Sequence, residues 1–123
     1  MTRFIHDQFA KDYLEEFLKP YGEVKAPLVV RSERREIDVL FLPHKEQLPE
    51  LKTLGLLGKM AQTVSIFEPF RNPVMADEIA DCLVKSLEVR RSFQRSARRK
   101  KRKFTDSEIP RLWIITPQYL RLF

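Results

Sequence analysis

Cysteine and glycine are scarce in this chain of 123 residues, which has one cysteine, Cys82, and three glycines. A single cysteine excludes an intrachain disulfide, so nothing implies an oxidising compartment. So few glycines exclude a flexible Gly-rich linker and a Gly-rich phosphate-binding loop. With only His6 and His44 beside Cys82, the chain also lacks the ligand set of a structural zinc site.

Long apolar runs are absent as well. No segment approaches the roughly 20 apolar residues that span a bilayer, and the first residues contain no apolar run of signal-peptide length. A hydrophobic fraction of 43% suits a single core, and the length suits one domain over residues 1–123. We therefore expect a soluble, cytoplasmic protein that has no membrane partner.

The net charge of +6 is unevenly distributed. Residues 1–89 hold 12 basic and 15 acidic side chains, whereas residues 90–103 hold nine basic side chains and no acidic one. This pattern argues against a uniformly basic nucleic-acid coat. It indicates an ordinary globular body that carries one basic segment.

The hydrophobic patterning predicts a mixed sheet of about four strands with flanking helices, which is an α/β fold. The last strand, nearly all apolar, is expected to be central and buried on both faces. Two adjacent rows, Phe9, Tyr13, Phe17 and Ala10, Leu14, Leu18, are expected to form one apolar face of the first helix. Ile79, Leu83 and Leu87, with Ala80 and Val84, are expected to form the apolar stripe of the long helix. In chain order, we predict a helix over 8–19, strands over 23–31 and 35–42, a helix over 50–62, a strand over 64–68, a long helix from 76 or 77, and a strand over 111–116. The first two strands are expected to form a hairpin, in which Pro27 favours an edge or a strand that begins near Leu28. The last strand–helix–strand unit is expected to be a right-handed parallel crossover.

Two acidic residues lie on the predicted strands. Asp38 is flanked by apolar residues and Glu68 closes its strand. Carboxylates in strand interiors are costly unless they are paired, solvated or metal-bound, and two of them close together suit Mg²⁺. Composition alone favours the simpler interpretation, ion pairing with Arg34, Arg35 or Lys25.

A wider set of sequence stretches resembles a group of cyanobacterial proteins similar to the recombination-promoting nuclease, or transposase-like, branch of the PD-(D/E)xK nuclease superfamily. The resemblance covers essentially the whole chain. It implies a restriction-endonuclease-like fold, helix–strand–strand–strand–helix–strand, with an extra helix between the second and third strands. The stretches that carry it are Phe4-Ile5-His6-Asp7-Gln8-Phe9-Ala10-Lys11, Arg35-Glu36-Ile37-Asp38-Val39, Phe67-Glu68-Pro69-Phe70-Arg71-Asn72 and Pro110-Arg111-Leu112-Trp113-Ile114.

The resemblance implies roles for particular residues. Asp38 and Glu68 would hold Mg²⁺ and act in catalysis, and Glu16 would be the acid of the first helix, with Glu15 or Asp12 as weaker candidates. His6, Asp7 and Lys11 match the opening motif of the transposase-like branch, in which Ala10 replaces a phenylalanine.

This sequence also departs from the superfamily pattern. The motif lysine two residues after the second acid is replaced by Phe70, and Ile37 stands where a proline would precede Asp38. Arg71, Lys59 and Lys85 are the candidates to supply the missing cation. A catalytically inactive descendant of the fold is therefore an alternative.

The basic segment is the second functional candidate. It is expected to extend the long helix beyond its buried face and to bind an acidic partner, for which phosphates provide counterion release. Its cations are Arg90, Arg91, Arg95, Arg98, Arg99, Lys100, Lys101, Arg102 and Lys103.

Together these features predict a Mg²⁺-dependent, nuclease-like protein associated with DNA. The alternative from another class is an interaction or nucleic-acid-binding module without catalysis, which pairs with itself as a homodimer or with another protein.

Overall fold

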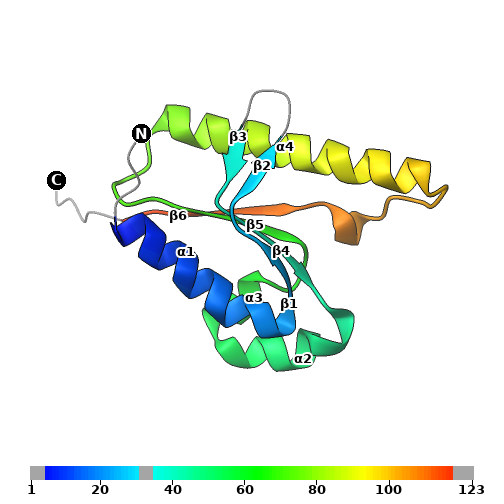
Figure 1. Ribbon diagram of the computed structural model, residues 1–123, viewed down its shortest axis with the longest axis horizontal. Coiled ribbons are helices and arrows are strands. Elements are labelled where there is room, and N and C mark those ends of the chain that lie inside the picture. The colour runs from blue at the N-terminus through cyan, green and yellow to red at the C-terminus, as the bar shows by residue number, and fades with distance from the viewer. Residues whose placement is uncertain (1–4, 31–34, 118–123) are drawn as a thin grey trace, which may run out of the picture.

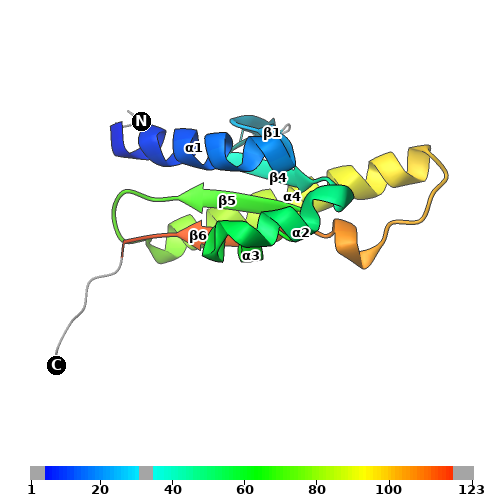
Figure 2. The same cartoon turned by 90° about the horizontal axis from the view of Figure 1, so that it is seen from below.

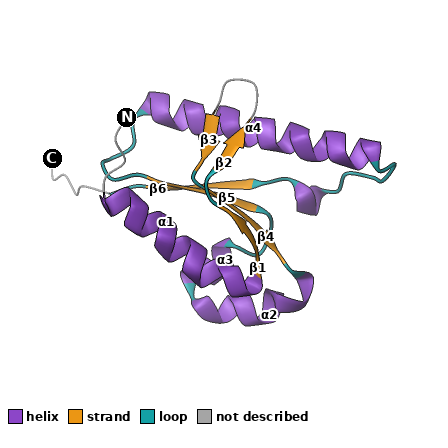
Figure 3. Cartoon of the chain, in the orientation of Figure 1, coloured by secondary structure: helices purple, strands orange, loops and turns teal. Residues whose placement is uncertain are grey.

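A computed structural model describes residues 5–30 and 35–117 of the chain. Figure 1 shows the arrangement and Figure 3 the classes of secondary structure. The helices are α1 (Ile5–Leu18), α2 (Leu48–Leu51), α3 (Leu56–Met60) and α4 (Ala76–Arg99), with 3₁₀ turns at Lys19–Tyr21, Lys45–Gln47, Lys52–Leu54 and Asp106–Glu108. The strands are β1 (Gly22–Lys25), β2 (Leu28–Val30), β3 (Arg35–Ile37), β4 (Val39–Pro43), β5 (Ser65–Pro69) and β6 (Arg111–Ile115).

Four strands form a mixed sheet in the order β1-β4-β5-β6, which confirms the predicted α/β class. β1 pairs with β4 and β4 with β5 in antiparallel fashion, whereas β5 and β6 are parallel. The parallel pair is joined by α4, because parallel neighbours need a long crossover connection. β2 and β3 make a separate antiparallel pair that lies beside α4 (Figure 1).

The sheet separates two helical layers. Figures 1 and 2 show α4 along one face and α1, α2 and α3 along the other. The larger core cluster joins Leu14 and Leu18 of α1 to Val39, Phe41 and Phe67 of the sheet. The smaller cluster, under α4, contains Ile37, Leu40, Ile66 and Val89.

Both strands of the predicted hairpin are interrupted. The first is divided around Ala26-Pro27, as the proline suggested, and the second is divided at Asp38. Alternation along one continuous strand would place Ile37 with Val39 and Phe41. Instead Ile37 joins Leu40 in the cluster under α4, because the break at Asp38 shifts the alternation.

Two other predictions need correction. The helix expected over 50–62 is divided at Gly55, whose φ of +71° suits glycine and ends the preceding turn. The strand over 111–116 was expected to be central, but β6 lies at the edge of the four-stranded sheet and all five of its residues are at least partly exposed. Its apolar character reflects its contacts with α4 and β5.

The predicted apolar faces of α1 and α4 are confirmed only in part. Leu14 and Leu18 of α1 are buried in the core, but the Phe9 row of α1 and the Leu83 stripe of α4 are exposed. Phe9 is 70% exposed, and Leu83 and Leu87 are 52% and 56% exposed. Lys11 of α1 is buried instead, and Lys85 of α4 turns inward to contact Glu68. At about 100° per residue, a side chain two positions away lies on nearly the opposite side of a helix. Burying Lys11 and Lys85 therefore turns Phe9 and Leu83 outward.

The end of α4 is built as a Schellman cap. The Arg102 N–H donates to the Ala97 carbonyl at 2.9 Å and the Lys101 N–H donates to the Arg98 carbonyl at 3.1 Å. Lys101 adopts the left-handed conformation, with φ of +54°. Side chains 98–103 are all exposed, as the charge pattern predicted, and Figure 1 shows this end projecting beyond the sheet.

Candidate active site

Asp38 and Glu68 meet where β4 begins and β5 ends. The last antiparallel pair of these strands is Val39 with Phe67, so Asp38 and Glu68 occupy the next position of the same register. The Asp38 N–H donates to Glu68 Oε2 at 2.7 Å. Both residues are buried, with 5% and 1% exposure. The structure therefore brings together the two carboxylates that the sequence singled out.

Lys85 of α4 is the main polar partner of Glu68. Its ammonium group donates to Glu68 Oε1, and also to the backbone carbonyl of Glu36 at 2.9 Å. Cys82, one turn earlier on the same face of α4, lies with its sulfur 3.7 Å from Glu68 Oε1. These contacts pin the middle of α4 to the carboxylate end of β5 and to β3.

Lys11 of α1 provides a second cation from the opposite layer. Its Nζ atom lies 3.2 Å from Asp38 Oδ1 and 3.6 Å from Glu36 Oε1. The Lys11 side chain is only 9% exposed, so this is a buried ion pair. The site thus consists of two buried carboxylates held between two lysines, which come from different helices.

The electrostatics of Glu68 reflect its burial. Loss of solvation raises the pKa of this carboxyl, and the nearby Asp38 charge raises it further, whereas the hydrogen bond from Lys85 lowers it. The upward causes dominate. The same burial, with the Glu68 charge, raises the pKa of the Cys82 thiol to about 12, so Cys82 is a small buried side chain rather than a nucleophile.

The structure also tests the simpler ion-pair interpretation. The carboxylates do pair with lysines, but with Lys11 and Lys85 rather than with Lys25, which instead lies 3.9 Å from Glu23. Arg34 and the side chain of Arg35 lie outside the described residues. The helical spacing of the two lysines was a signal in the sequence. Lys11 lies three and seven residues before the buried Leu14 and Leu18. Lys85 lies three residues after the buried Cys82 and four before the buried Val89.

The predicted acid of the first helix lies elsewhere. Glu16 is exposed, and with Asp12 and Glu15 it lines a shallow hollow beside Lys19. Five positions along a helix correspond to a rotation of about 140°, so Glu16 and the inward-facing Lys11 point in different directions. The α1 residue that reaches Asp38 is therefore Lys11. The side chains of its motif partners His6 and Asp7 lie outside the described residues.

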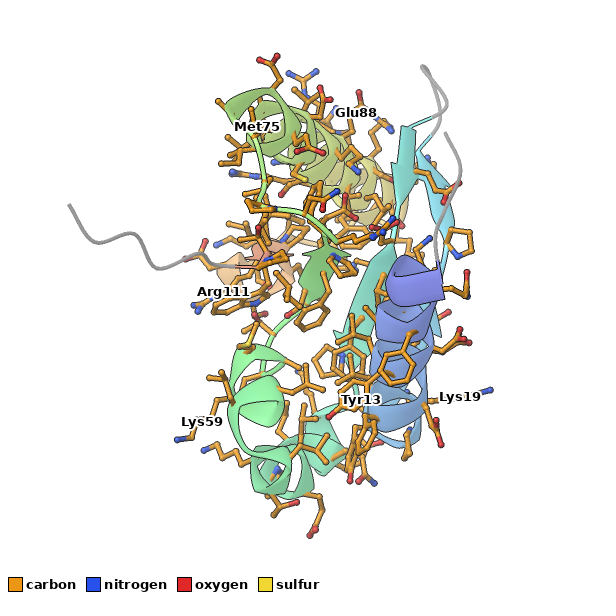
Figure 4. All side chains as sticks on the ribbon, turned by 90° about the vertical axis from the view of Figure 1, so that its left-hand side faces the viewer. Tyr13, Lys19, Lys59, Met75, Glu88 and Arg111 are labelled. Atoms are coloured by element: carbon orange, nitrogen blue, oxygen red, sulfur yellow. The ribbon has the colours of Figure 1, made fainter. Side chains whose placement is uncertain are left out.

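The remaining cation candidates do not share this position. Lys59 on α3 is exposed and points away from the sheet in Figure 4. Arg71 follows β5 and is exposed. Of the three candidates for the missing motif lysine, Lys85 is the one that contacts Glu68.

The basic segment forms a second region at the far end of α4. Arg95, Arg98 and Arg99 are exposed on the helix, and Lys100, Lys101 and Lys103 follow it. Arg102 makes an ion pair with Glu108 at 2.8 Å. That contact, with hydrogen bonds from Thr105, lowers the pKa of Glu108 to about 2. Most of the segment's cations are thus free to face an external partner.

Two further features are absent from residues 5–30 and 35–117. No cluster of three or more His, Cys, Asp or Glu side chains able to hold a metal ion is found within these ranges. In the same ranges, no helix is long and apolar enough to cross a membrane.

In comparisons with known proteins, no family model, no curated protein and no solved structure matches the chain.

Proposed function

We propose that this protein is a Mg²⁺-dependent nuclease of the PD-(D/E)xK type that acts on DNA. The observation that carries the proposal is the meeting of Asp38, Glu68 and Lys85 at one buried position. These are two acids and one lysine, the composition of the superfamily's motif, although the lysine comes from α4 rather than from β5.

The topology supports the same proposal. Without the small β2–β3 pair and the short helices, the order is α1-β1-β4-β5-α4-β6, with the sheet order β1-β4-β5-β6 and a parallel last pair. This is the helix–strand–strand–strand–helix–strand arrangement expected of a restriction-endonuclease-like fold. Asp38 then lies at the start of the second core strand and Glu68 at the end of the third.

The donor chemistry of the site fits Mg²⁺. This ion is commonly bound by one or two carboxylates, with waters and substrate phosphate oxygens completing its shell, and Asp38 and Glu68 provide two carboxylates from adjacent strands. The raised pKa of Glu68 has the same implication. A buried carboxyl that is poorly compensated by its surroundings gains from a cation placed nearby.

Each residue then has a defined task. Asp38 and Glu68 would hold Mg²⁺, which when bound activates water and offsets charge on a phosphodiester. Lys85 would orient the Glu68 carboxylate and place a positive charge beside the reacting phosphate, which stabilises the added negative charge of the transition state. Lys11 would fix Asp38 through their 3.2 Å contact.

The basic segment would hold the DNA backbone. Lys85 and Arg98 are thirteen residues apart on one helix, which corresponds to about 20 Å along its axis. One straight element therefore carries both the proposed catalytic lysine and the start of the exposed cations. Contacts of this kind bind phosphates without reading sequence.

A cleavage assay tests the proposal. Supercoiled plasmid is incubated with the protein and Mg²⁺ or Mn²⁺, and nicked and linear products are quantified. We expect cleavage that EDTA abolishes and that Asp38→Ala or Lys85→Met reduces at least ~100-fold, the scale of losing one transition-state charge contact. Lys59→Met, which removes an exposed lysine, serves as the matched control and should leave the rate unchanged.

A binding arm separates DNA contact from chemistry. Replacing Arg98, Arg99, Lys100 and Lys103 with glutamine spares Lys101 and the Arg102–Glu108 pair. Because each neutralised phosphate contributes about 0.9 to the salt slope, log Kd against log salt should become shallower by about 3 to 4. The control replaces four exposed lysines elsewhere, Lys19, Lys45, Lys52 and Lys59, and should change the slope little.

The catalytically silent alternative rests on one observation. Each carboxylate already has a lysine partner, an arrangement that also serves as a purely structural buried network. Cleavage that survives Asp38→Ala would show that the assigned site is wrong. DNA binding with a steep salt slope but no cleavage under any divalent cation would replace the nuclease with a binding module.

A further inference from the structure

The outer face of α4 is an apolar surface that nothing in the described chain covers. We define it as Ile79, Ala80, Leu83, Val84 and Leu87, whose large members are between 38% and 56% exposed. Figure 4 looks along α4 and shows side chains projecting from the helix on the side away from the sheet. A contiguous apolar stripe about two and a half turns long is characteristic of a protein interface rather than of scattered exposed residues.

We propose that this face binds a second copy of the same chain, so that two α4 helices pack antiparallel across a two-fold axis. The charges beside the two ends of the stripe are opposite in sign, so the ends are complementary. Asp77 and Asp81 flank its beginning, and Arg91 and Arg95 flank its end. All four side chains are exposed.

The charges also lie on the correct side of the helix. At about 100° per residue, Asp77, Asp81, Arg91 and Arg95 all fall on the same flank of the stripe, between about 80° and 160° from Leu83. In an antiparallel pair of helices, identical flanks meet. The acidic start of one α4 then lies against the basic end of its partner, and the two-fold axis repeats that contact. A parallel pair would instead place this flank against the partner's opposite flank, so the acidic and basic groups would not meet.

The same register makes the apolar residues complementary. The two-fold axis crosses α4 at the level of position 85 along the helix. This places Leu83 opposite the partner's Leu87, and small Ala80 opposite the partner's longer Arg90. A shallow hollow of about 430 Å³ lies in the second half of this face, lined by Val84, Leu87, Glu88, Arg90, Arg91 and Gln94. It would receive the first half of the partner's α4, which carries Ile79.

This interface does not cover the proposed active site. Lys85 lies about 160° around the helix from Leu83 and contacts Glu68 on the inner side. The dimer is therefore independent of the nuclease proposal, and either can fail without the other.

Sedimentation velocity of the full chain over a concentration series tests the proposal. We expect a species of twice the 14.7 kDa chain mass that dissociates on dilution. Leu83→Glu should weaken dimerisation at least ~100-fold, because it buries two unpaired carboxylates. Leu56→Glu is the matched control: Leu56 is 74% exposed on α3, and its substitution should leave the dissociation constant unchanged.

Charge reversal tests the antiparallel register without touching the apolar residues. Asp77→Arg and Arg91→Asp should each weaken self-association about tenfold. Mixing the two variants should restore dimerisation, because opposite charges then meet at both ends. Circular dichroism establishes that each variant is folded.

Three outcomes would overturn the proposal. A wild-type chain that stays monomeric throughout the series excludes self-association. A dimer that Leu83→Glu leaves intact places the interface elsewhere. Failure of the mixed charge variants to recover, when each alone is weakened, excludes the antiparallel arrangement and leaves the face to a different protein partner.

Discussion

Two glutamates of this protein accept a hydrogen bond from a basic side chain, yet their pKa values move in opposite directions. Glu68 pairs with Lys85 in the interior and its pKa is raised. Glu108 pairs with Arg102 at the projecting end of α4 and its pKa is lowered to about 2. The difference shows that the presence of a cation does not by itself fix the direction of a carboxyl group's pKa shift. Loss of solvation outweighs the partner inside the protein, whereas the partner prevails at the surface.

The region around Glu68 and the region around Glu108 also differ in what they can bind. Burying the charges of Glu68 and Lys85 costs free energy. A further positive charge nearby would stabilise the Glu68 carboxylate, as a metal-binding site requires. The surface pair belongs to a segment whose other cations face solvent. The helix α4 thus connects a buried site that would be stabilised by added positive charge to an exposed end that carries many positive charges.

The largest expected effect comes from breaking the interior pair. Lys85→Met leaves Glu68 buried without its cation, which should lower the free energy of unfolding at pH 7 by about 3 kcal/mol. The loss falls in the lower part of the usual range because the Lys85 side chain retains 16% exposure. Urea denaturation measures the change.

The pH dependence of that loss identifies its cause. The folded protein holds the Glu68 proton more tightly than the unfolded chain, so this group's contribution to stability falls as the pH rises above 4.5 toward the folded pKa. Removing Lys85 raises that pKa further, so the deficit of Lys85→Met should shrink at acidic pH. A deficit that is equal at all pH values would mean that lost packing, not charge, is responsible.

A smaller effect of the opposite sign is expected at the end of α4. Lys101 holds a left-handed conformation in the Schellman cap, and this costs a non-glycine residue about 1 kcal/mol. Lys101→Gly should therefore stabilise the protein by about that amount. Lys100→Gly removes the same charge from a residue with φ of −86° and should not stabilise it, which makes it the matched control in thermal denaturation.

The smallest effect concerns the surface pair. Glu108→Gln removes the charge but keeps an oxygen that can accept from the Thr105 N–H. Because the pKa of Glu108 is lowered in the folded state, the wild type should have a small advantage above pH 4.5 that disappears as the pH falls toward 2. Melting temperatures across this range measure it, with Asp106→Asn controlling for net charge. An advantage that persists at pH 2 would contradict the assignment.

Much of the architecture could be predicted from local patterns. The long helix, the hairpin and the parallel last strand follow from periodicity, turn residues and the length of the crossover. Asp38 and Glu68 were identifiable because carboxylates are unusual within apolar strands. The cations were harder, since Lys85 was one of three candidates and the ion pair of Lys11 with Asp38 went unpredicted. A lysine spaced as part of an apolar helical row gives no indication of which carboxylate it will meet.

The class of fold, the two acidic positions and the exposed basic segment all follow from residue type and short-range spacing, so they could be read before any tertiary contact was known. Which face of α1 and of α4 turns inward depends instead on long-range contacts. The hydrophobic pattern favoured Phe9 and Leu83 on the inside, but Lys11 and Lys85 are drawn to Asp38 and Glu68. A buried carboxylate without a cation costs more than an exposed leucine. The long-range ion pairs therefore set the rotation of both helices. They left the Phe9 row of α1 and the Leu83 stripe of α4 at the surface, while Leu14 and Leu18 of α1 stay in the core.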